Sequence, residues 1–156
     1  WTYDNRLYFG DDNGNLFRFY DTPDDPDVYN DNGAPIYAVW ETKDIDGGSF
    51  FKYKTFKYLA VQLASALRTS VRISYLKKGV WTLLKEDSLT ATYLMFSKLV
   101  FSRFSFSSDN TPRTVSTKMR IKKIDKVRFR FENDTVNEPF GVFNYALEYT
   151  VNSDIK

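Results

Sequence analysis

The sequence predicts an all-β protein: an antiparallel β-sandwich of jelly-roll-like topology, with a β-hairpin as an N-terminal appendage. Apolar and polar side chains alternate with a period of two in seven or eight short runs, and turn-forming residues separate these runs. No stretch shows the longer periodicity of an amphipathic helix. Phe, Trp and Tyr make up 18% of the 156 residues, and aromatic side chains favour pleated, half-buried surfaces. We therefore expect a hairpin and acidic linker over 1–34 and a sandwich domain over 35–156.

The first element is a hairpin within residues 6–20. Its strands cover 7–9 and 16–19, and Asn13-Gly14 between them is a strong turn signal. An isolated hairpin is marginally stable in water, so we expect this one to pack either on the domain that follows or on strands missing upstream.

The next segment, residues 21–35, contains three prolines and five aspartates and is expected to be a loop. Its carboxylates could bind a hard cation, but their spacing does not match that of an EF-hand. A solvated linker is the favoured interpretation.

The expected strands of the sandwich share alternating apolar side chains. They lie within residues 36–42, 50–63, 70–76, 80–84, 99–107, 119–133 and 143–151. The run from Tyr58 to Leu67 could also form a short helix, but Leu59, Val61 and Leu63 share one face of a strand, which we favour. In the last strand, one face is expected to carry the apolar residues Phe143, Tyr145, Leu147, Tyr149 and Val151.

Composition excludes several chemistries. The chain has no Cys and no His, so disulfides, cysteine nucleophiles, Cys-based zinc sites and a Ser-His-Asp triad are impossible. Many of the acidic residues lie in the linker, and others such as Glu41, Glu132 and Glu148 occur singly, which gives no support to a glycosidase pair. We therefore expect no enzyme activity, no cofactor and no metal site.

No membrane association is expected either, because no apolar run approaches the roughly 20 residues of a membrane span. We expect no secretory leader, and the opening on Trp1 suggests a fragment of a longer protein.

Charge is divided unevenly along the chain, although the net charge is only +2. Residues 1–48 hold 11 acidic and 3 basic side chains, and residues 49–156 hold 9 acidic and 19 basic ones. Two solvated faces that attract each other would explain this pattern. A boundary near Gly47-Gly48, where a segment of different origin joins the domain, would explain it equally.

The segment from Arg113 to Arg130 holds eight Lys or Arg residues and one acid, Asp125. It could contact phosphates, but strand alternation places Lys126, Arg128 and Arg130 on the solvent face, opposite Val127, Phe129 and Phe131. We do not expect nucleic acid to be a partner.

Exposed aromatic side chains on a sandwich can stack on sugars. The candidates for ligand binding are Tyr93, Trp40, Trp81 and Tyr53. Tyr93, in the irregular "TATYLMF", is the one most expected to be exposed. Aromatic residues on strands more often belong to the core, so this remains the alternative interpretation.

Several stretches of the sequence resemble segments of known structural proteins. The stretch "LYFGDDNGNLFRFYD" resembles the closing hairpin of a β-propeller blade. The segments that follow, "PIYAVWETKDI", "FKYKTFKYLAVQL", "KKGVWTLL", "MRIKKIDKVRFRFEN" and "LEYTV", resemble the end of certain bacteriophage virion proteins. The resemblance rests on structural motifs and assigns no functional residue.

The resemblance implies a non-enzymatic structural or assembly module of a phage tail or virion protein, located in the virus particle. Its partners would be other virion subunits or copies of itself. The alternative is a carbohydrate- or receptor-binding module that recognises a host-surface glycan.

Overall fold

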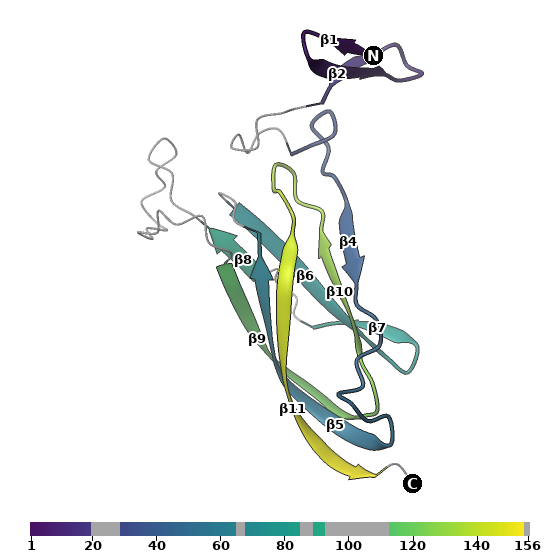
Figure 1. Ribbon diagram of the computed structural model, residues 1–156, viewed down its shortest axis with the longest axis vertical. Helices are drawn as coiled ribbons and strands as arrows, with labels where there is room; N and C mark the ends of the chain where they lie inside the picture. The colour runs from purple at the N-terminus through teal and green to yellow at the C-terminus, as the bar shows by residue number, and fades with distance from the viewer. Residues whose placement is uncertain (20–28, 65–67, 85–88, 93–112, 155–156) are drawn as a thin grey trace.

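A computed structural model describes residues 1–19, 29–64, 68–84, 89–92 and 113–154 (Figure 1). All regular structure in these ranges is β, and every strand pairing is antiparallel, which confirms the predicted class. Most of the acidic loop and the strand expected over 99–107 lie outside the described residues, as does Tyr93.

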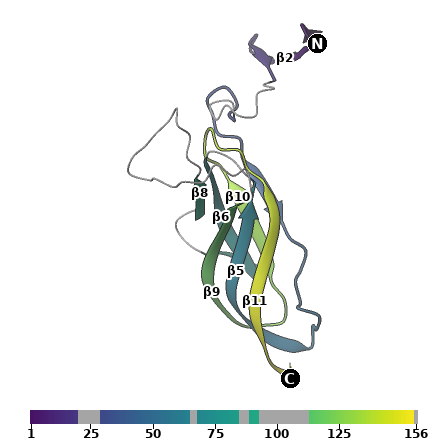
Figure 2. The same cartoon turned by 60° about the vertical axis from the view of Figure 1, so that its left-hand side comes forward.

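The N-terminal hairpin gains a third strand. β1 (Thr2–Tyr3), β2 (Arg6–Gly10) and β3 (Leu16–Arg18) form a separate sheet in that order, which we call the N-terminal sheet. Figures 1 and 2 show it beyond one end of the sandwich. Its strands pair with no described strand of the sandwich.

The turn between β2 and β3 lies where the sequence predicts it, and it spans residues 11–15. The last paired residues are Gly10 and Leu16, and of the two expected turn residues only Gly14 has a positive φ, 84°. The Asp11 carboxylate accepts hydrogen bonds from the Asn15 backbone and side-chain nitrogens, both at 2.8 Å. These contacts lower the pKa of Asp11, with the Asn15 side chain as the largest cause. Hydrogen bonds to the Asp11 carboxylate therefore fix the conformation of this turn.

One layer of the sandwich, the outer sheet, has the strand order β4-β10-β6-β7, and β8 also pairs with β6. Its strands are β4 (Ala38–Glu41), β6 (Arg68–Lys77), β7 (Val80–Leu83), β8 (Leu89–Thr92) and β10 (Arg128–Asn133). β8 pairs with the first part of β6 and β7 with the last part, so the two follow one another along the same edge.

The other layer is a three-stranded sheet of order β11-β5-β9, formed by β5 (Lys52–Leu63), β9 (Arg113–Ile124) and β11 (Val142–Asp154). The strand favoured for Leu59, Val61 and Leu63 is confirmed, since all three are fully buried on β5. Figure 2 shows these strands side by side as one layer over the outer sheet.

The core lies between the two layers and takes side chains from four strands and one connection. The buried apolar residues are Phe56, Leu59, Val61, Leu63, Val71, Ile73, Met119, Ile121, Ile124, Val127, Phe129 and Phe131. Burial of apolar surface on this scale is the main stabilising term of a sandwich.

The run 119–133 is not one strand. β9 ends at Ile124 and β10 begins at Arg128, and the two strands belong to opposite layers. The buried residues step by two up to Ile121, and then by three to Ile124, because the register with β5 shifts at this point. This shift and Lys123, with φ of 54°, turn the chain toward the other sheet.

The last strand also departs from strict alternation. The register of β11 shifts between Val142 and Asn144, and Phe143 is left 68% exposed instead of in step with Tyr145 and Leu147. A β-bulge adds one residue and so reverses the face of the side chains beside it.

The strand order establishes antiparallel pairing and two facing layers. A jelly-roll topology stays a prediction.

Candidate functional site

The exposed face of the outer sheet carries a row of charged side chains. β10 alternates, so Phe129 and Phe131 point into the core while Arg128, Arg130 and Glu132 point outward. This confirms the sequence-based placement of the basic side chains on the solvent side of this strand.

Arg130 contacts strands on both sides of β10. Its Nη2 lies 2.6 Å from Glu41 Oε1 on β4, and its guanidinium carbon lies 4.0 Å from the centre of the Trp81 ring on β7. Ser74 of β6 is the register partner of Arg130 and is small enough to let the guanidinium pass over it. Ion pairing and cation–π contact therefore fix this side chain across the sheet.

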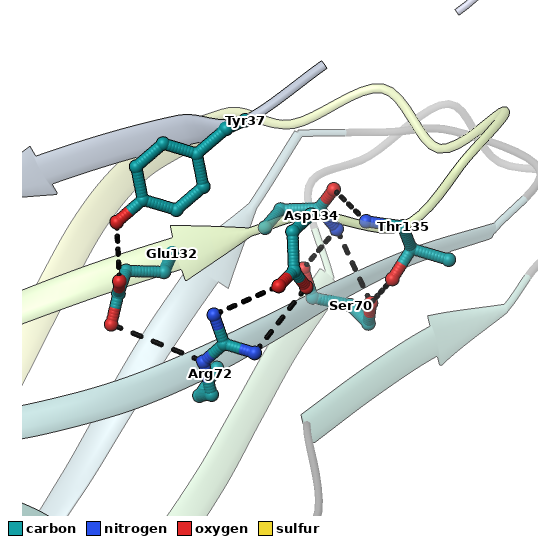
Figure 3. Close-up of polar contacts among 7 residues, drawn as sticks. Tyr37, Ser70, Arg72, Glu132, Asp134 and Thr135 are labelled. Atoms are coloured by element: carbon teal, nitrogen blue, oxygen red, sulfur yellow. Dashed lines mark hydrogen bonds and ion pairs between the residues drawn. The ribbon is translucent and has the colours of Figure 1, made fainter. Parts of the chain in front are cut away.

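A second group lies at the other end of the same face (Figure 3). Arg72 Nη2 is 3.0 Å from Asp134 Oδ2, and Arg72 Nε is 4.0 Å from Glu132 Oε2. The Tyr37 hydroxyl donates to Glu132 Oε1 at 2.5 Å, which raises the pKa of Tyr37. The partners of Arg72 raise its pKa too, with Asp134 as the largest cause.

Asp44 forms ion pairs with two basic side chains near the start of β10, Lys126 and Arg128. Lys126 Nζ donates to Asp44 Oδ2 at 2.7 Å, and Arg128 Nε donates to Oδ1 at 3.0 Å. The hydrogen bond from Lys126 is the largest cause of a lowered pKa for Asp44, and the same contact raises the pKa of Lys126.

A buried polar cluster lies where β6 and β10 meet the loop after β10 (Figure 3). Ser70 Oγ donates to Glu138 Oε2 at 2.5 Å, and Asn133 Nδ2 donates to the Ser70 carbonyl at 2.9 Å. Ser70, Asn133 and Glu138 are each at most 7% exposed. The cluster connects the loop after β10 to the sheet by hydrogen bonds.

The lysine hollow is a recess of about 540 Å³ at the end of the sandwich opposite the N-terminal sheet. Its lining consists of Tyr53, Lys77, Lys78, Lys123, Ile124, Asp125 and Lys126. In Figure 1 the β6–β7 turn, the β9–β10 connection and the start of β5 come together at this end. Recesses of this size commonly hold small ligands.

Backbone geometry sets where these lysines lie. Lys78 and Gly79 form a two-residue turn between β6 and β7, with positive φ values of 51° and 81°. Lys123 sits at the register shift that ends β9. Two turns from different parts of the chain thus present basic side chains to one recess.

The three aromatic candidates that the structure describes do not form one site. Trp40 stacks on Phe131 with ring centroids 5.4 Å apart and lies 6.0 Å from Tyr145 of β11. It therefore helps to close the edge between the two layers, although 44% of it stays exposed.

Trp81 is partly covered by Arg130, as described above, and Tyr53 lines the lysine hollow. Tyr93 lies outside the described residues.

Sequence reasoning missed the lysines of the hollow. Lys77, Lys78 and Gly79 signalled a turn, and Lys122-Lys123 looked like part of a continuous strand. Paired lysines at two turns were the available signal, but nothing in the sequence brings the two turns together.

No family model, no curated protein and no solved structure matches this chain. Within the described ranges, no group of three or more acidic residues is placed to hold a metal ion. The same ranges contain no helix that is long and apolar enough to cross a membrane.

Proposed function

We propose that this chain is a non-enzymatic structural module that joins a larger assembly, such as the phage tail its motifs resemble. The observation that carries the proposal is the exposed apolar surface of the N-terminal sheet. Its large exposed side chains are Trp1, Tyr3, Leu7, Phe9, Leu16 and Phe19. A sheet this small cannot bury such a surface by itself, so a neighbouring subunit is needed to cover it.

Charge supports a second copy of the chain as that neighbour. The N-terminal hairpin and linker, residues 1–34, hold an excess of six acidic side chains, and the sandwich domain, residues 35–156, holds an excess of eight basic ones. The N-terminal part of one copy therefore complements the sandwich of another, and opposite charge also speeds their encounter.

Sedimentation equilibrium tests this proposal. The intact chain should exceed its monomer mass of 18.3 kDa as concentration rises, and added salt should weaken the association. The double variant Leu16→Ser/Phe19→Ser should stay monomeric, because it removes exposed apolar area from the N-terminal sheet.

The matched control is Phe143→Ser/Val151→Ser, which removes exposed apolar area from β11 instead. It should associate as the unchanged chain does. A monomer at all concentrations, or equal association of both double variants, would contradict the proposal.

The second candidate function is carbohydrate binding, which is favoured by the position of Tyr53 at the lysine hollow. A glycan array probed with the intact chain, Tyr53→Ala and Tyr93→Ala tests it. Binding that either substitution removes would support a glycan-binding module. Silence of the intact chain across the array would rule this function out.

A further inference from the structure

The lysine hollow holds more positive charge than its neighbours neutralise. Lys126 is paired with Asp44, but no described carboxylate lies within ion-pair distance of Lys77, Lys78 or Lys123. Lys77 Nζ donates to the Lys122 carbonyl at 3.2 Å, which leaves its other two N–H groups for a ligand. Asp125 is the single acid in the lining.

A buried cation lies directly behind this lining. Lys54 is fully buried, and its Nζ donates to the carbonyl oxygens of Asp125, at 2.9 Å, and of Ser49. Among the described residues no carboxylate pairs with Lys54. Its charge therefore adds to the positive potential of the recess, since a buried charge is weakly screened by solvent.

Tyr53 supplies the apolar part of the recess. It precedes Lys54 on β5, is half-buried, and lines the recess together with Ile124. Lysines beside an aromatic ring match a ligand that carries anionic groups on a ring with an apolar face. An acidic sugar has both features, and the volume of about 540 Å³ lies within the range of small-ligand sites.

We infer that the lysine hollow binds an anionic saccharide, with its sulfate, phosphate or carboxylate groups on Lys77, Lys78 and Lys123 and a ring face on Tyr53. This inference rests on the second proposed function and specifies its ligand class. It is independent of the assembly role of the N-terminal sheet.

The direct test is calorimetric titration of the intact chain with five probes at 50 mM and 200 mM salt. The probes are a heparin-derived hexasaccharide, hexagalacturonic acid, maltohexaose, inorganic phosphate and a 12-nucleotide single strand of thymidylate. The two acidic hexasaccharides should bind, and their affinity should fall with salt. Maltohexaose and phosphate alone should bind at least about tenfold more weakly, because each supplies only half of the recognised features.

Matched variants separate the hollow from general surface charge. Lys78→Gln/Lys123→Gln removes two charges from the hollow, and Lys57→Gln/Lys118→Gln removes two from other parts of β5 and β9. Tyr53→Leu is compared with Tyr58→Leu, because Tyr58 lies on the same strand and has its own lysine, Lys118, 5.9 Å from its ring centroid. Each hollow variant should raise the Kd by about tenfold, and each control by less than about twofold.

The failures can be told apart. Equal losses in hollow and control variants would overturn the assignment to this recess. Binding of maltohexaose as tight as that of the acidic probes would refute the anionic class but keep carbohydrate binding. Inorganic phosphate that binds as tightly as the acidic hexasaccharides would contradict a saccharide ligand. A 12-nucleotide single strand of thymidylate that binds more tightly than they do would contradict it as well. No binding of any sugar would reject both the inference and the second proposed function.

Discussion

The guanidinium of Arg130 lies over the ring of Trp81, 4.0 Å from its centre, although the whole of β6 separates the strands that carry them. The contact is possible because Ser74, the β6 partner of Arg130, is small. Since Arg130 also pairs with Glu41, one side chain connects β4, β10 and β7.

A double-mutant cycle measures this contact. Arg130→Met and Trp81→Leu should each destabilise the fold, and their coupling should be about 0.5–1 kcal/mol, as expected for a partly exposed cation–π pair. Urea unfolding of the four chains gives the coupling. Additive losses would show that the contact contributes nothing to stability.

Asp44 should make stability depend on pH. Its pKa is lowered in the folded chain, chiefly by the Lys126 hydrogen bond, so its contribution is complete above the ordinary pKa of an aspartate. That contribution is lost as pH falls through the lowered folded value, below about pH 4. Thermal melts from pH 6 to pH 2 should show a smaller decline for Asp44→Asn than for the unchanged chain. Parallel declines would contradict this account.

Gly47 and Gly48 provide a matched pair in one turn. Both have positive φ, but a Cβ at Gly47 would lie 2.9 Å from the Tyr149 ring, whereas one at Gly48 would meet open space. Gly48→Ala should cost about 1 kcal/mol, the backbone penalty alone. Gly47→Ala should cost about 1 kcal/mol more, because the displaced Tyr149 ring loses its contact with Phe56.

The Tyr149→Ala background controls this comparison. Once the ring is removed, the two alanine substitutions should cost the same in urea unfolding. A difference that persists would place the cause in the backbone.

Lysines usually lie at the surface and contribute little to stability, but the buried Lys54 should make a large contribution. Lys54→Ala leaves a cavity and frees the Ser49 and Asp125 carbonyls, so we expect a loss of about 2–4 kcal/mol. Lys57→Ala, at an exposed position of the same strand, should change stability by less than about 0.5 kcal/mol. Similar losses of stability for Lys54→Ala and Lys57→Ala would show that the burial of Lys54 does not stabilise the fold.

Period-two alternation was enough to predict the all-β class and the buried faces of β5 and β10, because one-sided burial imposes that period. It failed at Phe143 and across 119–133, where the register shifts change the face and the layer. A single extra residue in a strand leaves no clear mark on composition, so such bulges are difficult to predict from one sequence.

The candidate site was harder to predict than the fold. Tyr53 was identified as an aromatic candidate, but its lysine neighbours come from turns at 77–79 and 123–126. These two turns come together because β6 and β9 lie in facing layers. The alternation of side chains along a strand does not show which layer the strand joins. Nothing in the sequence marked Lys54 as a buried lysine.

The central claim is that a stable sandwich carries an N-terminal sheet whose apolar surface is completed by another copy of the chain. Hydrogen exchange of the intact chain, measured from low to high protein concentration, tests it most directly. Amides of β5 and β10 should exchange slowest throughout, and those of β2 should exchange fast in dilute solution and slow down as concentration rises. Protection of β2 equal to that of β5 in dilute solution, or no change in β2 at the highest concentration, would contradict the claim.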